Sequence, residues 1–334
     1  MNEPTPERII GILVGYQPSE ALRTAFRLDV FTAVGQGARR PADLARRIDA
    51  SERGVRMLCD YLVVLELLTK DDRGYELTDE SRRFCDRRSP DYVGTAAEFL
   101  CSGELRDAFG RLDEAVRRGS TAVSAEGTMA RDHEVWTRFA RGMVPLMRPP
   151  AEALAELILE DGRAVRKVLD VAAGHGLFGI AVAKRRPDAD VYAVDWGAVL
   201  EVAAGHAREA GVGPRFHEIA GSAFEVDLGA SYDLVLVPNL LHHFSQQTCV
   251  ALLRRIHTAL ADTGRLVILE HVPDENRVCP PRAAAFALVM LATTPEGDAY
   301  TFSEYRSMLH QAGFTDVTRH AVPESVHTAL VCSK

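Results

Sequence analysis

The second half of the chain alternates short apolar segments with helical ones, and this alternation restricts the possible fold more than any other feature. Most of the apolar segments are separated by roughly 10 to 20 residues with helical periodicity. Strands that alternate with helices form a parallel sheet with helices on both faces. The sequence therefore predicts a doubly wound α/β domain whose strands are KVLDVA, DVYAVD, RFHEIAG, YDLVLVPN and GRLVILEHV.

The first part of the chain has a different pattern, mainly helical from Glu7 to about Phe99. Pro41 suits the first turn of a helix, and the segment SERGVRMLCDYLVVLELL is apolar with helical spacing. A DDRG turn then separates two short strand-like segments. Two helices followed by a hairpin predict a winged-helix arrangement.

Further helices are expected between Cys101 and Pro150, interrupted by the small and polar segment RRGSTAVSAEGT. The pair Pro149-Pro150 closes this region, and we expect a hinge there. The expected division of the chain is therefore 1–100, 101–150 and 151–334.

Composition limits the partners and the compartment. The net charge of −8 argues against a nucleic acid or an anionic membrane as partner, because Lys and Arg hold phosphates. The six cysteines form no CxxC pair, and MNEPTPERII does not resemble a signal peptide. No apolar run approaches the ~18 residues needed to span a bilayer, so we expect a cytoplasmic protein.

The turn after the first predicted strand, VLDVAAGHG, is a candidate ligand site, since ligands of such sheets bind at the carboxyl ends of the strands. Gly174 and Gly176 allow the backbone to approach a ligand closely. The sequence does not match GxxxxGK[ST], a usual phosphate-binding pattern. Asp170 would repel a phosphate and attract a cation or an amine.

Two later strand ends complete this site. Asp195, in AVDW, can accept hydrogen bonds from both hydroxyls of a ribose. Ser222, in AGSAF, lies beside Ala223 and Phe224, which suit a flat base. A nucleoside with a cationic tail and no phosphate fits all three positions, and S-adenosylmethionine is such a molecule.

The pair His242-His243 follows the fourth strand and should lie at the mouth of the sheet. A histidine titrates near neutrality and can take a proton from a hydroxyl group. A hydrogen-bonded structural histidine is the alternative for both residues. His242, Glu270 and His271 could also form a metal site, but adjacent strand residues point to opposite faces, so we expect no metal.

Together these motifs resemble the class I small-molecule methyltransferases of the caffeate and bacterial polyketide-tailoring type, which have an N-terminal winged-helix dimerisation domain. The resemblance covers nearly the whole chain and rests on VLDVAAGHG, AVDW, AGSAF, FARGM, LLHHF and LVILEHV. It implies a Rossmann-like catalytic domain of seven strands at 151–334, preceded by connecting helices at 101–150 that contribute to the acceptor pocket. The dimerisation domain would occupy 1–100, and the chain would form a homodimer.

The resemblance also implies roles for individual residues. Gly174 and Gly176 would approach the methionine part of S-adenosylmethionine, Asp195 the ribose, and Ser222 with Phe224 the adenine. S-adenosylhomocysteine would be the product. The expected cofactor set further includes Asp170, Ala172, Trp196, Ala223 and Asn239.

In the same relatives, the histidine that matches His242 is the general base, and the acid that matches Glu270 orients it. His243 stands where plant relatives have Asp, and Ala299 stands where they have a second orienting acid. Glu296 or Asp298 could replace that acid. A Met-rich apolar lining suits a flat acceptor, and the expected acceptor set is Phe139, Met143, Met147, His243, Phe286, Val289, Met290 and Thr294.

We expect methyl transfer to a hydroxyl of an aromatic or polyketide-like small molecule. Alternatives are methylation of an activated carbon, as in a keto acid, and a relative that uses the cofactor pocket for decarboxylation, hydroxylation or a pericyclic step. Outside enzymes, the six arginines and three acids from Ala38 to Leu58 could belong to a winged-helix DNA-binding regulator. The sequence does not distinguish O, C and N as the methylated atom.

Overall fold

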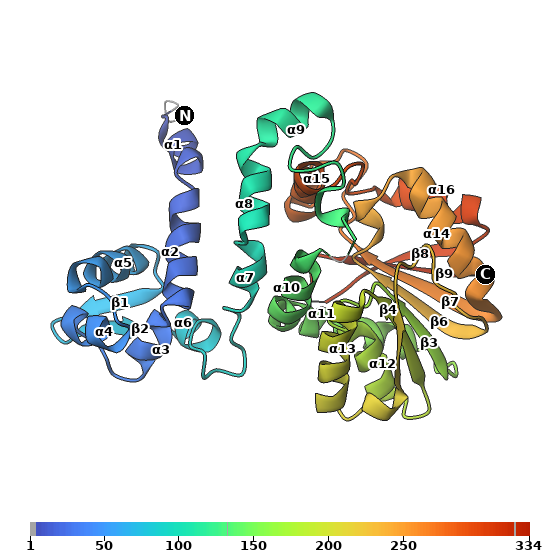
Figure 1. Ribbon diagram of the computed structural model, residues 1–334, viewed down its shortest axis with the longest axis horizontal. Helices are drawn as coiled ribbons and strands as arrows, with labels where there is room; N and C mark the ends of the chain where they lie inside the picture. Colours follow the sequence, from blue (N-terminus) through green and yellow to red (C-terminus); the bar gives the residue numbers. More distant parts are fainter. Residues whose placement is uncertain (1–4, 132, 324) are drawn as a thin grey trace. The chain divides into compact units, whose positions relative to one another are not determined.

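The chain consists of two compact units, Met1–Ser102 and Gly103–Lys334, which Figure 1 shows as a ribbon. The structure is a computed structural model that describes residues 5–131, 133–323 and 325–334. Each unit has its own hydrophobic core.

The first unit is helical apart from one hairpin. Its core is formed by apolar side chains of the second to fifth helices and the hairpin. The elements are α1 (Glu7–Leu13), α2 (Tyr16–Arg27), α3 (Val30–Gly35), α4 (Pro41–Arg47), α5 (Glu52–Val64), β1 (Leu68–Asp71), β2 (Gly74–Leu77), α6 (Asp79–Phe84) and α7 (Ala96–Leu100).

The order of α4, α5 and the hairpin confirms the predicted winged-helix arrangement. Pro41 is the first residue of α4, where its missing N–H costs no hydrogen bond. Asp71 forms the hairpin turn by accepting hydrogen bonds from the backbone N–H groups of Arg73 and Gly74. Gly74 has a φ of +119°, and a Cβ there would lie 2.3 Å from the carbonyl oxygen of Arg39, so this position requires glycine.

The second unit contains a seven-stranded sheet with the order β5-β4-β3-β6-β7-β9-β8. The five predicted segments form its first five strands, which are parallel. The strands are β3 (Lys167–Val171), β4 (Asp190–Asp195), β5 (Phe216–Ala220), β6 (Tyr232–Pro238), β7 (Leu260–Glu270), β8 (Thr315–Ala321) and β9 (Thr328–Ser333).

The last two strands differ from the expected parallel sheet. β9 runs antiparallel to both β7 and β8. The connection from β8 to β9 is short, and a short connection can join antiparallel neighbours but is too short for the crossover that parallel strands need. The sheet is therefore mixed at this edge.

Helices cover both faces of the sheet, as Figure 1 shows. α12 (Leu177–Arg185) and α13 (Gly197–Glu209) lie on one face, with α11 (Val144–Leu159) packed against α12. α14 (Gln246–Ala259) and α16 (Phe302–Ala312) pack against each other on the other face. Their apolar side chains and those of β3, β6 and β7 form the main core.

The remaining elements of this unit lie before β3 or in the connections between strands. They are α8 (Gly103–Gly110), α9 (Leu112–Arg118), η1 (Gly127–Met129), α10 (Glu134–Gly142), η2 (Gly213–Arg215), η3 (Leu241–His243) and α15 (Pro281–Thr293).

The hinge expected at Pro149-Pro150 is wrong. Both prolines lie inside α11, which continues to Leu159, so the expected boundary between 150 and 151 falls within a helix. Proline removes a helical hydrogen bond, but Met147, Pro150, Ala151 and Leu154 are buried along α11. The free energy gained by burying this apolar face exceeds the free energy lost with the missing hydrogen bonds.

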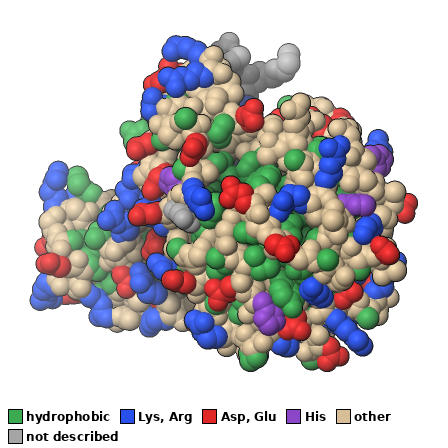
Figure 2. Space-filling model, turned by 45° about the vertical axis from the view of Figure 1, so that its right-hand side comes forward, with side chains coloured by type: hydrophobic (Ala, Val, Ile, Leu, Met, Phe, Trp, Pro, Cys, Tyr) green, Lys and Arg blue, Asp and Glu red, His purple; other side chains and the backbone are tan. Residues whose placement is uncertain are grey.

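Basic and acidic side chains are interspersed over the face seen in Figure 2. Among residues 5–131, 133–323 and 325–334, no helix has the length and hydrophobicity needed to cross a membrane.

Candidate active site

The turn after β3 has an unusual backbone. Ala172, Gly174 and Gly176 have φ values of +54°, +57° and +74°. A left-handed alanine costs about 1–3 kcal/mol, and such strain persists only where the surrounding structure enforces it. Here the N–H of Ala173 donates to the carbonyl of Val194 at 3.1 Å, which ties the turn to β4.

The two glycines differ in what surrounds them. A Cβ at Gly176 would lie 3.0 Å from the Cβ of Ala203, so glycine lets the start of α12 approach α13 closely. A Cβ at Gly174 would lie 3.4 Å from the ring of Phe139, which extends over the turn from α10.

Asp195 ends β4 and holds this turn with its side chain. One carboxylate oxygen accepts the N–H of Gly174 at 2.8 Å, and the other accepts the N–H of Trp196 at 2.7 Å. Burial raises the pKa of Asp195 to about 6, although both hydrogen bonds act in the opposite direction. Each oxygen retains a lone pair that can accept a ligand hydroxyl.

Asp170 does not lie as expected. We predicted that it would attract the cationic part of a ligand, but its side chain is fully buried beneath α12. One oxygen accepts the N–H of Gly179 at 3.0 Å, and the other has no partner among the described residues. Burial raises its pKa to about 8. Asp170 therefore supports the first turn of α12 and exposes no surface to a ligand.

Ser222, Ala223 and Phe224 form the turn after β5. The hydroxyl of Ser222 accepts the N–H of Phe224 at 3.2 Å. The ring centroids of Phe224 and Phe244 are 4.9 Å apart, and the two rings are nearly perpendicular. All three residues are half-buried, so the turn presents both apolar and polar atoms at its surface.

Asn239 and Trp196 extend the same edge of the sheet. Asn239 follows β6 with a φ of +54°, and its buried side-chain oxygen has no hydrogen-bond partner among the described residues. Such an oxygen costs about 1–3 kcal/mol and is satisfied if a ligand supplies a donor. Trp196 is half-buried, with the guanidinium of Arg131 over its ring at 5.7 Å.

His242 and Glu270 form a buried pair between η3 and the end of β7. The Nδ1 of His242 lies 2.5 Å from one oxygen of Glu270. The other oxygen accepts the N–H groups of Leu240 and Leu241 at 3.1 and 2.8 Å. The carboxylate accepts the Nδ1 hydrogen, so Nε2 is left as the proton acceptor.

Burial shifts the pKa values of both groups in opposite directions. It lowers the pKa of His242 and raises the pKa of Glu270, because each loses hydration of its charged form. The backbone hydrogen bonds lower the pKa of Glu270 in turn. A neutral imidazole fixed in one tautomer can act as a general base.

No second acid reaches the His242 ring from the loop after α15. The carboxylate of Asp298 pairs with Arg277 at 3.2 Å, and Glu296 is exposed. The backbone N–H of Asp298 instead donates to the carbonyl of His242 at 2.9 Å. The loop therefore holds the backbone of His242, and Glu270 holds its ring.

Aromatic rings surround the histidine pair. Phe286, on α15, meets the ring of His242 at 4.8 Å. The ring of His243 lies 4.1 Å from that of His242 and 5.0 Å from Trp136. Phe286 and His243 thus lie beside His242.

The other members of the predicted acceptor set are placed differently. Phe139 stacks on His175 at 5.6 Å, beside the glycine turn. Val289 is half-buried, whereas four residues are at least nine-tenths buried: Met143, Met147, Met290 and Thr294. Thr294 donates its hydroxyl to the carbonyl of Met290 and accepts the N–H of Gly297, which is a structural role.

Two aromatic residues of this region were missed by the sequence analysis. Trp136 contacts Phe139 and His243, and His175 is buried beneath Phe139. Trp136 lies one helical turn before Phe139, so the spacing could have indicated it. Within the described ranges, no three His, Cys, Asp or Glu side chains are arranged to hold a metal ion.

Comparison with known proteins shows that this sheet with its glycine turn and strand-end carboxylate belongs to a methyltransferase that uses S-adenosylmethionine. The chain belongs to the O-methyltransferase family. The O-methyltransferase domain of that family matches residues 109–315, and its dimerisation domain matches residues 10–87.

Individual proteins support this assignment over the whole chain. The tetracenomycin polyketide synthesis 8-O-methyl transferase TcmO of Streptomyces glaucescens is 29% identical over 325 residues, covering 95% of this chain and 94% of that protein. A crystal structure of a candidate O-methyltransferase from Nostoc punctiforme is 50% identical, with a TM-score of 0.95, and covers 99% of this chain and 100% of that one.

The human N-acetylserotonin methyltransferase, solved in complex with S-adenosylmethionine, has the same fold, with a TM-score of 0.86 and 24% identity. That match covers 100% of this chain and 99% of the human one.

We predict that Gly176→Ala lowers the free energy of unfolding by about 1–3 kcal/mol, because alanine is strained at a φ of +74° and its Cβ crowds Ala203. Gly197→Ala is the control, since a Cβ at the start of α13 meets nothing within 4 Å. Urea unfolding, monitored by circular dichroism, measures the free energy of unfolding of both variants. Equal stability of the two variants would show that the turn relaxes without cost.

Proposed function

We propose that this enzyme methylates a hydroxyl group of a small aromatic or polyketide-like molecule, with His242 as general base. The observation that carries the proposal is the buried contact of 2.5 Å between His242 and Glu270 at the carboxyl edge of the sheet. It fixes a neutral imidazole beside aromatic rings, which is the arrangement that deprotonation of a hydroxyl requires. The similarity to TcmO supports a polyketide-like acceptor.

The residues along β3, β4, β5 and β6 fit the cofactor. The carboxylate of Asp195 has acceptor capacity for two ribose hydroxyls, and the side-chain oxygen of Asn239 needs a donor such as an ammonium group. Ser222 and Phe224 suit the edge and face of the adenine. S-adenosylmethionine supplies a methyl group on a positively charged sulphur, and S-adenosylhomocysteine is the remaining product.

Residues of the chain itself would remove the proton from the acceptor hydroxyl. The Nε2 of His242 would accept that proton, and the Nδ1 hydrogen bond to Glu270 stabilises the imidazolium that results. The rings of Phe286 and His243 would form walls that position a flat acceptor ring against Nε2.

We also propose that residues 1–100 form a homodimer and that residues 101–150 help to enclose the acceptor. The match to the dimerisation domain supports the first point. So does an apolar surface on α1, where Ile9, Ile10, Ile12 and Leu13 are each at least half exposed. An apolar surface of this kind is typical of a subunit interface.

We predict that Asp195→Asn weakens binding of S-adenosylmethionine by about tenfold or more, since hydrogen bonds to a charged group contribute about 1.5–3 kcal/mol. Asp190→Asn, at the other end of β4 and hydrogen-bonded to His217, should bind normally. Because the pKa of Asp195 is raised to about 6, binding by the wild type should weaken as the pH falls through 6. Calorimetry between pH 5 and 8 tests this, and a pH-dependence retained in Asp195→Asn would contradict it.

Replacing the base should affect turnover and not cofactor binding. We expect His242→Ala to lower kcat by about 10²–10⁴-fold and to leave the Kd for S-adenosylmethionine near normal. Transfer of labelled methyl to a panel of phenols and hydroxylated polyketides measures the rate. His320→Gln, on β8, is the control. A wild-type rate in His242→Ala would mean that proximity alone suffices.

The dependence of kcat on pH should reflect protonation of the His242–Glu270 pair. Acidification protonates the His242–Glu270 pair and removes the base, so kcat should rise with pH along an acid limb and then level off. Glu270→Gln removes the neighbouring negative charge, which lowers the pKa of His242 further. We therefore expect the acid limb to move to lower pH and the plateau to fall by about tenfold or more. If the acid limb of the kcat profile stays at the same pH in Glu270→Gln, the limb arises from protonation of another group.

A further inference from the structure

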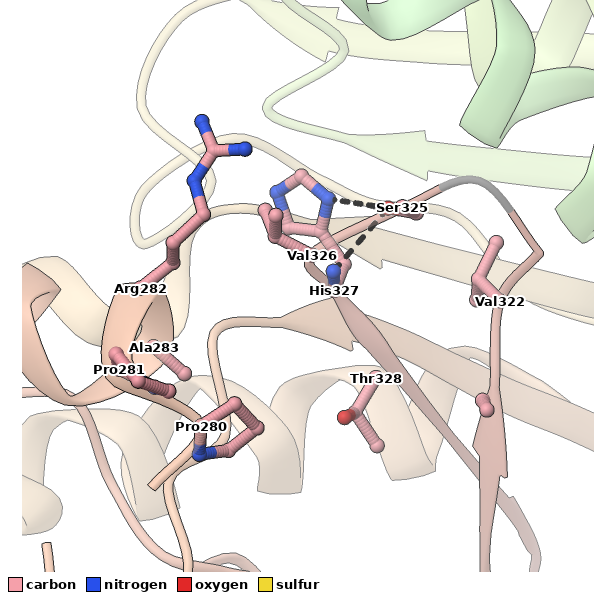
Figure 3. A pocket seen from close by; sticks show the side chains of 10 residues that line it. Pro280, Pro281, Arg282, Ala283, Val322, Ser325, Val326, His327 and Thr328 are labelled. Atoms are coloured by element: carbon pink, nitrogen blue, oxygen red, sulfur yellow. Dashed lines mark hydrogen bonds between the residues drawn. The ribbon is translucent and has the colours of Figure 1, made fainter. Parts of the chain in front are cut away.

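A hollow of about 420 Å³ lies between the first turn of α15 and the connection from β8 to β9, as Figure 3 shows. None of its lining residues belongs to the cofactor or acceptor sets proposed above. They are Pro280, Pro281, Arg282, Ala283, Ala321, Val322, Ser325, Val326, His327 and Thr328. The hollow therefore needs an explanation of its own.

Among the described residues that line this hollow, the charged side chain is the cation Arg282. Arg282 is exposed and has no ion pair or hydrogen bond with any described residue, and the described lining residues include no acid. The first helical hydrogen bond of α15 is donated by Ala284 to Pro280, which leaves the N–H groups of Arg282 and Ala283 at the helix start available. A helix N-terminus adds a partial positive charge to the guanidinium.

His327 provides a second, buried polar group. Its side chain is only 6% exposed, and its Nδ1 lies 2.8 Å from the hydroxyl of Ser325. That hydroxyl already accepts the backbone N–H of His327 at 3.1 Å, so its own hydrogen is available to Nδ1. This tautomer places the imidazole hydrogen on Nε2, which has no partner among the described residues and faces the side of Arg282 in Figure 3.

We propose that this hollow binds the carboxylate of a small organic acid. The carboxylate would lie between the guanidinium of Arg282 and the Nε2 hydrogen of His327, a charge-assisted arrangement. The apolar part of the acid would contact Pro280, Val322 and Val326, which line the hollow. The proposal rests on these residues and does not depend on the proposed general base.

A line of rings connects this hollow to the candidate active site. The ring centroids of His327 and His271 are 4.4 Å apart. His271 in turn stacks on Phe286, with 4.0 Å between the ring centroids, and Phe286 contacts the ring of His242. Arg282 and Phe286 are four residues apart on α15 and so lie on one helix face. The bound acid could therefore be a separate ligand or an acidic group of the methyl acceptor.

The probe for this site is benzoate, with neutral benzamide as its matched analogue, titrated into the full chain by calorimetry. We expect benzoate to bind and benzamide to bind at least tenfold more weakly. Arg282→Met should weaken benzoate binding at least tenfold, and Arg282→Lys should weaken it less. Arg306→Met, an exposed arginine on α16, is the control and should bind normally. Equal binding of both probes, or normal binding by Arg282→Met, would overturn the proposal.

A second variant tests Glu324, which precedes Ser325 in the sequence and lies outside the described residues. Glu324→Gln should still bind benzoate with the same dependence on Arg282. If benzoate binds only in Glu324→Gln, the site is not an acid-binding site of the natural chain. Competition between benzoate and an active acceptor would identify the acceptor's own acidic group as the ligand, whereas simultaneous binding would identify a separate acid.

Discussion

The candidate active site depends on one buried carboxylate. Glu270 has no exposed surface, and its oxygens accept hydrogen bonds from the N–H groups of Leu240 and Leu241 and from the Nδ1–H of His242. Burial of an unpaired carboxylate is costly, so these donors and the carboxylate require one another. Because Glu270 ends β7 and the donors follow β6, this contact fixes η3 against the sheet and sets the direction of the imidazole.

The cofactor side of the site is built in the same way. Asp195 ends β4 and accepts the N–H of Gly174 from the turn after β3. In both places a carboxylate at the end of one strand holds the loop that follows its neighbour, β3 beside β4 and β6 beside β7. Strong hydrogen bonds to charged groups can hold loops that have no regular structure. Because β3 and β6 are adjacent parallel strands, the two loops held in this way lie at the same end of the sheet.

Some of this arrangement can be predicted from the sequence, and some cannot. Apolar periodicity predicts the five parallel strands, and the spacing of Asp195 predicts its strand-end position. Periodicity does not predict the burial of Asp170, since a carboxylate at a strand end can face either the helix or the ligand. The continuous helix through Pro149 depends on packing against α12, which is a tertiary effect that overrides a local signal.

Three of the unpaired buried atoms of the second unit lie near the carboxyl ends of β3 and β6. Among the described residues, an oxygen of Asp170, the Nε2 of His175 and the side-chain oxygen of Asn239 have no partner. All three belong to the ends of β3 and β6 or to the turns that follow. Each such atom costs about 1–3 kcal/mol, and a fold keeps this cost only where another requirement outweighs it. At Asp170 that requirement is support of the first turn of α12; at Asn239 we propose that it is ligand binding, because the same sheet edge carries the strained Ala172 and the two carboxylate-held loops.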